Sequence, residues 1–284
     1  MMETGRFHRT GAVGAPGATG TDGSIGTTDV IGKIGATATI GPRRRWLSIA
    51  TGIAVIAGIA AVAGIGRRAG AAEQGVKIAP PKTDIATGGA SPARMVVAGG
   101  CFWGVQGVFQ HVRGVLDAVS GYSGGKAEDA NYTAVSHGRT GHAEAVQVTY
   151  DPAQVSYGTL LQIFFSVAHN PTELNRQGPD VGPQYRSAIF PVDAEQQRVA
   201  RAYIAELDAA KVFRAPIVTR IEEGQRFYQA EAYHQDYMTE HPNDPYILIN
   251  DRPKIVELRK LFPDRFRPEP VLVKRNSPMK KVGG

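Results

Sequence analysis

The sequence contains a single cysteine, Cys101, in 284 residues. One cysteine excludes a disulfide within the chain and a zinc site built from several thiolates. The seven histidines are scattered and show neither an HxH nor an HExxH spacing, which metal sites often use. We therefore expect no metal and no bound cofactor, and we interpret the histidines as surface or structural residues.

A strong excess of one charge is also missing once the N-terminal segment is set aside. The whole chain has 32 Lys and Arg against 26 Asp and Glu, but positions 1–71 hold eight of the basic residues and three of the acidic ones. The remainder has 24 basic and 23 acidic residues, a net charge of +1. The high pI of the whole chain is therefore no sign of nucleic-acid binding, and we expect no nucleic-acid partner.

The N-terminal segment 1–71 is rich in Gly, Ala and Thr and shows no apolar period until residue 46. Three arginines (43–45) precede the uncharged run 46–66, and two more basic residues follow it. This order resembles a twin-arginine export signal and predicts an exported protein. Two alternatives stay open: residues 46–66 are long enough for an uncleaved membrane anchor, and a wrongly assigned start codon would leave the first 40 residues untranslated.

The folded domain is predicted at 94–284, after a Pro- and Gly-rich linker at 72–93. Alternating apolar positions predict strands, and apolar positions three or four residues apart predict helices. Their order predicts an α+β fold, a two-layer sandwich with split βαβ elements and a long C-terminal tail. Strands are expected at 95–98, 115–125, 141–152, 185–191 and 216–222, helices at 101–113, 156–168 and 193–211, and a helical or semi-regular segment at 227–241.

Cys101 lies where a predicted strand meets a predicted helix, directly after Gly99 and Gly100. A lone cysteine is often only a small core residue, but the free N–H groups at a helix N-terminus favour a thiolate, so this position suits a nucleophile. Phe102 shares the apolar face of the helix, whereas Trp103 lies off that face. We interpret Trp103 as the wall of a pocket beside the thiol.

Glu144 is the acidic residue most suggestive of chemistry. In a strand it shares a face with Val146 and Val148, so it is either buried with them or reaches solvent at the strand end. Burial would raise the pKa of the carboxyl and make it a proton donor near neutral pH. A cysteine and a buried acid suggest attack on a group whose oxygen must be protonated. A hydrolase or acyltransferase that pairs Cys101 with His142 or His234 is the alternative.

Five ordered motifs then indicate a family. The chain carries "GGCFWGVQGVF", "GYSGG", "GHAEAV", "LNRQGPDVGPQYRS" and "FYQAEAYHQDY" in this order. With these motifs it resembles the A-type peptide methionine sulfoxide reductases over about residues 94–265. The resemblance implies a two-layer α+β sandwich related to the ferredoxin-like arrangement, and reduction of the S epimer of methionine sulfoxide in oxidised proteins or peptides, without a cofactor.

The resemblance also implies roles for single residues. Cys101 would attack the sulfoxide sulfur, and Glu144 would protonate the sulfoxide oxygen. The hydroxyls of Tyr132 and Tyr185 would hold that oxygen. The apolar wall for the substrate methyl group and an acid lining the same site would come from Phe102, Trp103 and Asp180.

Three departures from the family pattern qualify the resemblance. Asn170 stands where the family often has Asp, and Pro183 where Thr is common. The tail "VLVKRNSPMKKVGG" contains no resolving cysteine, so an external reductant is expected, either a thioredoxin-like protein or a small thiol. A domain that only binds oxidised methionine, without turnover, is a further alternative. We expect the protein to be a monomer.

Overall fold

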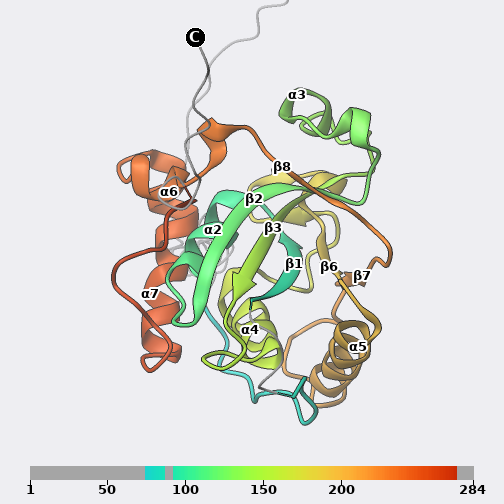
Figure 1. Cartoon of the computed structure of the whole chain (residues 1–284), viewed down its shortest axis with the longest axis vertical. Helices are drawn as coiled ribbons and strands as arrows, with labels where there is room; N and C mark the ends of the chain where they lie inside the picture. Colours follow the sequence, from blue (N-terminus) through green and yellow to red (C-terminus); the bar gives the residue numbers. More distant parts are fainter. Residues whose placement is uncertain (1–73, 87–91, 274–284) are drawn as a thin grey trace, which may run out of the picture. The chain divides into compact units, whose positions relative to one another are not determined.

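The computed structural model describes residues 74–86 and 92–273 (Figure 1). The predicted export signal, the alternative membrane anchor at 46–66 and the last residues of the tail lie outside the described residues. Within 74–86 and 92–273, no helix is long and apolar enough to cross a membrane.

Six strands form one mixed sheet in the order β7-β6-β1-β3-β2-β8. Every neighbouring pair is antiparallel except β6 and β7, which are parallel. A separate two-stranded sheet pairs β4 with β5. The strands are β1 (Ala93–Gly99), β2 (Val115–Ser123), β3 (Ala143–Tyr150), β4 (Arg176–Gln177), β5 (Asp180–Val181), β6 (Ser187–Phe190), β7 (Arg220–Ile221) and β8 (Phe227–Gln229).

The central strands have the predicted split βαβ order. Strands β1 and β2 are joined through α2, and β3 lies between them in the sheet. With β6 beside β1, the four central strands take the ferredoxin-like order, and the predicted α+β class is confirmed. The helices are α2 (Phe102–Gln110), α3 (Tyr132–Val135), α4 (Tyr157–Ile163), α5 (Ala194–Ala209), α6 (Tyr237–Glu240) and α7 (Arg252–Leu261).

Two π-helical segments and three short 3-10 turns complete the part of the fold formed by residues 92–273. The π-helical segments are η3 (Phe164–Ala168), which continues α4, and η6 (Ile247–Asp251), which leads into α7. The 3-10 turns are η2 (Ala127–Asp129), η4 (Pro183–Tyr185) and η5 (Ala232–His234).

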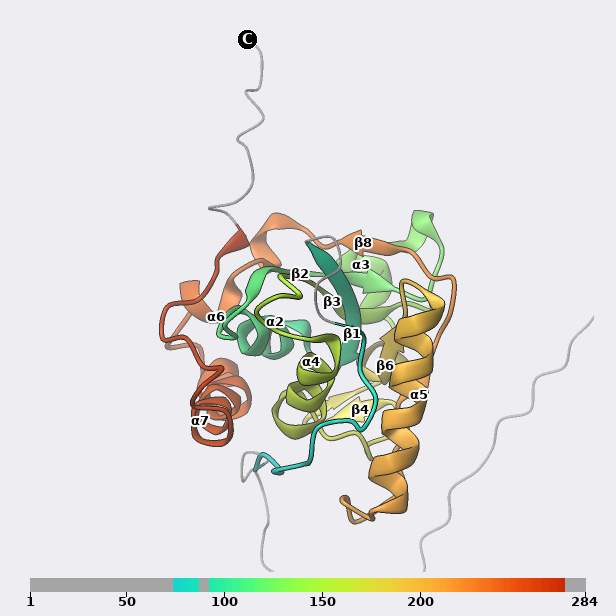
Figure 2. The same cartoon turned by 60° about the horizontal axis from the view of Figure 1, so that its bottom comes forward.

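The main core lies between the sheet and helices α2 and α4, beside which α7 also packs (Figure 2). Side chains alternate along β3, so Val146 and Val148 point into this core while Ala143 and Ala145 join a smaller cluster on the opposite face. Glu144 has the same parity as the two valines. The alternation therefore directs its carboxyl toward the helix-covered face, where α2 begins.

The local signals for the helices are largely those that the sequence indicates. Ser156 caps α4 as predicted, because its side chain accepts a hydrogen bond from the N–H of Thr159 at 3.1 Å. Asp193 caps α5 in the same way through the N–H of Gln196. The predicted C-terminal tail contains a helix that the sequence analysis did not predict: residues 252–261 form α7. Pro253 lies in its first turn, where proline is tolerated.

Residues 74–86, within the predicted linker, form no helix or strand, yet they pack on the domain. Ile78 is buried in the core, and its carbonyl accepts a hydrogen bond from the side chain of Gln162 at 2.7 Å. Asp84 accepts one from the N–H of Gly158 in α4 at 2.7 Å. This segment is therefore held against the domain from residue 76 to residue 84.

Candidate active site

A tight turn between β1 and α2 places the only cysteine. Gly100 has φ +89°, a left-handed conformation that favours glycine, and a Cβ there would overlap the buried side chain of Gln177. Cys101 follows as the N-cap residue of α2, with φ −54° and ψ 125°. The thiol is half-buried and free. The two glycines thus let the chain reverse closely enough to bring the thiol to the start of the helix.

Glu144 reaches the same helix end from β3. Its side chain is buried, and Oε2 accepts a hydrogen bond from the backbone N–H of Phe102 at 3.1 Å. Burial raises the pKa of Glu144 to about 8, Asp180 and Asp251 add to the rise, and the Phe102 N–H opposes it. Of the two alternatives for Glu144, the buried one is confirmed. The carboxyl is protonated at neutral pH and able to donate its proton.

The thiol does not have the lowered pKa that the helix end led us to expect. Burial raises the pKa of Cys101 well above its usual value, and the charges of Glu144 and Asp251 raise it further, whereas the backbone N–H of Trp103 lowers it. Two facts explain the difference. The first N–H of α2 donates to Glu144 and not to the thiol. Removing a charged thiolate from water also costs more free energy than a hydrogen bond from one backbone N–H supplies. In the resting site, Cys101 is a neutral thiol.

Tyr132 and Tyr185 come from two short elements and converge on this pair. Tyr132 begins α3 and Tyr185 ends η4, and both are half-buried. Burial raises the pKa of each hydroxyl, and the charges of Glu144 and Cys101 act on both. Both hydroxyls therefore keep their protons and are available as hydrogen-bond donors around the thiol and the acid, as the resemblance implies.

Asp180 lies on β5 and accepts a hydrogen bond from the hydroxyl of Tyr246. Burial raises the pKa of Asp180, while Tyr246 and Lys254 lower it. The charge of Asp180 acts on Cys101 and on Glu144. Its predicted place at the edge of the same site agrees with these interactions.

The two aromatic residues after Cys101 differ in their surroundings. Phe102 is buried, 1% exposed, with its ring centroid 5.9 Å from that of Tyr122. Trp103 is half-buried and stacks on Tyr237, with centroids 3.7 Å apart and planes 8° apart. Tyr246 meets Trp103 edge-on at 6.0 Å. Trp103 is therefore part of an aromatic wall, of which the sequence analysis identified only the first member.

The histidines do not supply a base for the thiol. His142 is bonded through both ring nitrogens, to the N–H of Gly125 and the carbonyl of Lys126. His234 accepts a hydrogen bond from Trp103 Nε1 at 3.3 Å through Nδ1. Within residues 92–273 neither imidazole hydrogen-bonds Cys101, so the Cys–His hydrolase interpretation lacks its essential pair. The same residues hold no cluster of His, Cys, Asp and Glu that could bind a metal ion.

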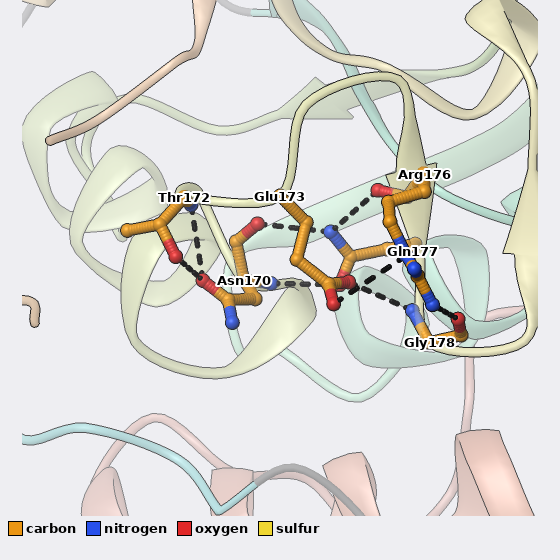
Figure 3. Close-up of polar contacts among 6 residues, drawn as sticks. All are labelled: Asn170, Thr172, Glu173, Arg176, Gln177 and Gly178. Atoms are coloured by element: carbon orange, nitrogen blue, oxygen red, sulfur yellow. Dashed lines mark hydrogen bonds and ion pairs between the residues drawn. The ribbon is translucent and has the colours of Figure 1, made fainter. Parts of the chain in front are cut away.

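The loop before Tyr185 accommodates two of the three departures from the family pattern, Asn170 and Pro183. Asn170 Oδ1 accepts hydrogen bonds from the N–H and the hydroxyl of Thr172, which a carboxylate oxygen would also accept (Figure 3). Gln177 ties the loop together through the N–H and the carbonyl of Asn170, both at 2.9 Å, and rests on Gly100. Pro183 occupies the first turn of η4, where its missing N–H leaves no internal bond unmade.

Four residues of the site were missed by the sequence analysis: Tyr237, Tyr246, Asp251 and Lys254. They come from α6, η6, α7 and the short connection between them, where the apolar pattern has no steady period. One signal was present. Asp251 is an acidic residue at the end of the apolar run "YILIND", and an acid next to such a run can be buried together with it.

A neutral thiol beside a protonated carboxyl and two tyrosine hydroxyls can attack an electrophilic atom while its oxygen substituent is protonated. This fold and site define a thiol-dependent oxidoreductase. The model of the family "Peptide methionine sulfoxide reductase" matches residues 93–265, so the chain belongs to that family.

Similar proteins match about three fifths of the chain. Over 178 residues the chain is 61% identical to a protein of Mesorhizobium japonicum named peptide methionine sulfoxide reductase MsrA 2, covering 63% of this chain and 91% of the relative. A protein of the same name from Synechocystis is 51% identical over 174 residues, covering 61% and 81%. The crystal structure of reduced Mxr1 from Saccharomyces cerevisiae is 31% identical, covers 57% and 92%, and has a TM-score of 0.48.

Proposed function

We propose that this protein reduces the S epimer of methionine sulfoxide in oxidised polypeptides, with Cys101 as the nucleophile and Glu144 as the acid. One observation supports this assignment above the others: the thiol and a carboxyl with a pKa near 8 meet at the same helix end, 3.1 Å separating Glu144 Oε2 from the Phe102 nitrogen. Sulfoxide reduction needs a sulfur nucleophile and a proton for the departing oxygen, and this pair supplies both.

In the proposed reaction, Cys101 Sγ attacks the sulfoxide sulfur while Glu144 gives its proton to the sulfoxide oxygen. The attack forms a bond between Sγ and the substrate sulfur. The protonated oxygen then moves to Sγ while the substrate S–O bond and the new S–S bond break, and the thiol proton restores the Glu144 carboxyl. The products are the thioether and the sulfenic acid of Cys101, so the substrate is reduced and the cysteine oxidised. Tyr132 and Tyr185 donate hydrogen bonds to the oxygen, and Trp103 contacts the methyl group.

The sulfenic acid needs two external thiols to return to the thiol, because the chain has no second cysteine. The first thiol attacks Cys101, releases water and forms a mixed disulfide. The second attacks the mixed disulfide, releasing the oxidised reductant as a disulfide and restoring Cys101. A thioredoxin-like protein or a small thiol would serve, and we propose that the enzyme works as a monomer.

The test uses a methionine sulfoxide peptide of each epimer with excess dithiothreitol. Only the S epimer should be consumed, and Cys101→Ser should abolish turnover. Consumption of both epimers, or full activity in Cys101→Ser, would overturn the proposal. Binding of the peptide without any turnover in dithiothreitol would instead favour the non-catalytic alternative.

The role of Glu144 is tested separately by sulfenic acid formation in a single turnover. Glu144→Gln should slow this step on the order of 10²–10³-fold, because general acid catalysis typically contributes that much. Since only the protonated carboxyl donates, the wild-type rate should fall as pH rises through about 8. The variant should lack this fall. An unchanged rate in Glu144→Gln would remove the residue from the acid role.

We also propose that the chain is exported through its N-terminal segment and repairs oxidised proteins outside the cytoplasm. The proposal rests on the order of arginines 43–45 and the uncharged run 46–66. In a bacterial host with a twin-arginine export system, the full chain should appear outside the cytoplasm, and a variant with lysine at positions 43 and 44 should stay inside. A full-length product found in the membrane fraction would favour the anchor.

A further inference from the structure

A buried ion pair lies against the first turn of α2. Asp251, at the end of η6, is fully buried, and its Oδ1 accepts a hydrogen bond from Lys254 Nζ at 3.1 Å. The Lys254 side chain is 16% exposed. A Cβ at Gly104 would overlap Asp251 Oδ1 and approach Lys254 Nζ to 2.7 Å. The absence of a side chain at Gly104 is therefore what lets the pair approach the helix that Cys101 caps.

The pair is incomplete as a hydrogen-bonded unit. Asp251 Oδ2 is buried and has no hydrogen-bond partner within the described part of the chain. A buried carboxylate with one free oxygen is costly, and a surface ion pair would avoid this cost. Packing alone does not account for a charge held in this position.

The groups around Asp251 belong to the active site. Its charge acts on Cys101 at the N-cap of α2, on Glu144 in β3 and on Tyr246 beside η6. Burial raises the pKa of Asp251, Lys254 in α7 opposes this rise by charge and by hydrogen bonding, and Asp180 in β5 and Asp244 before η6 add to it. Lys254 also acts on Asp180 and on His169, which follows η3. The charge of Asp251 thus depends on Lys254 and in turn affects both the thiol of Cys101 and the carboxyl of Glu144.

We propose that Asp251, held by Lys254 against the first turn of α2, is a positioning residue that adds to burial in keeping Cys101 in its neutral thiol form. This inference rests on the proposed function. A thiol reacts with oxidants and alkylating agents far more slowly than a thiolate, so the arrangement protects a cysteine that no second cysteine can rescue within the chain. Lys254 acts through Asp251, because it favours the ionised form of that carboxyl by charge and by hydrogen bonding.

The proposal is tested by iodoacetamide alkylation of Cys101 as a function of pH, which needs no reductase activity. Asp251→Asn keeps the shape of the side chain and removes the charge, so the thiol pKa should fall by about one pH unit and alkylation at pH 7 should be about tenfold faster. An alkylation profile identical to that of the wild type would overturn the proposal.

The dependence on Lys254 is tested by a double-mutant cycle. Lys254→Met should shift the alkylation profile in the wild-type background and leave it nearly unchanged in the Asp251→Asn background. Equal shifts in both backgrounds would show that Lys254 does not act through Asp251. These outcomes are independent of sulfoxide reduction, so the proposed function can fail while this inference holds, and the reverse is also possible.

A second acid–lysine pair in α7 provides the matched control. Lys260 Nζ lies 3.2 Å from Glu257 Oε1, with the same three-residue spacing, but the Lys260 side chain is 66% exposed. Glu257→Gln and Lys260→Met should leave the alkylation profile of Cys101 unchanged. A shift as large as that of Asp251→Asn in either control would mean that any charge change in α7 alters the thiol, and it would overturn a specific role for Asp251.

Discussion

The active site has two sides of different construction. The helix-end side consists of Gly100 and Cys101, in the turn between β1 and α2, and of Glu144 on β3. The C-terminal wall consists of Tyr237, Tyr246, Asp251 and Lys254, which belong to short helical segments and the connection between them. The reacting groups therefore lie where the central strands meet α2, whereas the wall adds contacts and charge from the C-terminal segments that pack beside α2. Changes on the helix-end side should alter folding stability, and changes in the wall should alter mainly binding.

The largest effect on stability is expected at Glu144. Its pKa is about 8 in the folded protein and near 4.5 in a free carboxyl, so the folded state holds this proton more tightly than the unfolded chain. The resulting stabilisation is complete below the unfolded pKa and is lost as pH rises through about 8. At about 1.4 kcal/mol per pKa unit, the free energy of unfolding of the wild type should fall by a few kcal/mol between pH 6 and pH 9 relative to Glu144→Gln.

Urea unfolding of both proteins at the two pH values measures this difference. Comparison with Glu144→Gln cancels the contributions of the titrating groups that the charge of Glu144 does not affect. A constant difference between the two proteins from pH 6 to pH 9 would contradict the raised pKa. It would also remove the contrast between the two sides of the site, because the protonation of Glu144 would then contribute nothing to the free energy of unfolding.

The next largest effect is expected from Gly100→Ala. The left-handed φ of +89° and the overlap with Gln177 should together cost about 3 kcal/mol, and the displaced turn should slow sulfenic acid formation. Gly178→Ala is the matched control, since Gly178 has φ +54° but no atom within 4 Å of the position that a Cβ would take. It should cost only about 1 kcal/mol. Equal losses in the two variants would show that close packing at the turn is unimportant.

The helix-end side was largely predictable because its signals are local. Two glycines, a change of apolar period at Cys101 and the alternation around Glu144 lie within short stretches, and short stretches define strands, turns and helix starts. The raised pKa of the thiol was not predictable. It depends first on the burial of the thiol and then on the charges of Glu144 and Asp251, and both of these residues are distant from Cys101 in sequence.

The C-terminal wall was missed for the same physical reason. Tyr246 meets Asp180 and Asp251 meets Gly104 only after residues 66 and 147 positions apart have been brought together by the sheet. No apolar periodicity within a short stretch of sequence indicates a contact between residues so far apart in the chain. The places of Tyr132 and Tyr185 were indicated by the resemblance to a family, whereas the residues of short irregular elements give little evidence of their own.

A smaller effect is expected from Trp103→Phe. Trp103 connects the helix-end side of the site with the C-terminal wall. The indole comes from α2, stacks on Tyr237 and donates to His234 Nδ1 at 3.3 Å. Phenylalanine keeps an apolar ring but loses this hydrogen bond and part of the stack. We expect kcat/KM for the S-sulfoxide peptide to fall about tenfold, mainly through KM. A fall in kcat alone would place Trp103 with the reacting groups instead of the binding wall.

The smallest effect is expected from Tyr237→Phe. The substitution keeps the ring that stacks on Trp103 at 3.7 Å and removes only the hydroxyl, which donates a long hydrogen bond of 3.3 Å to Asp244. A half-buried bond of this length contributes little, so kcat/KM should stay within about twofold of the wild type. Tyr237→Leu removes the stack and should raise KM several-fold with little change in kcat. If Tyr237→Phe were as damaging as Tyr237→Leu, the hydroxyl would be the functional part of the residue, and the C-terminal wall would act through polar groups more than through its aromatic surface.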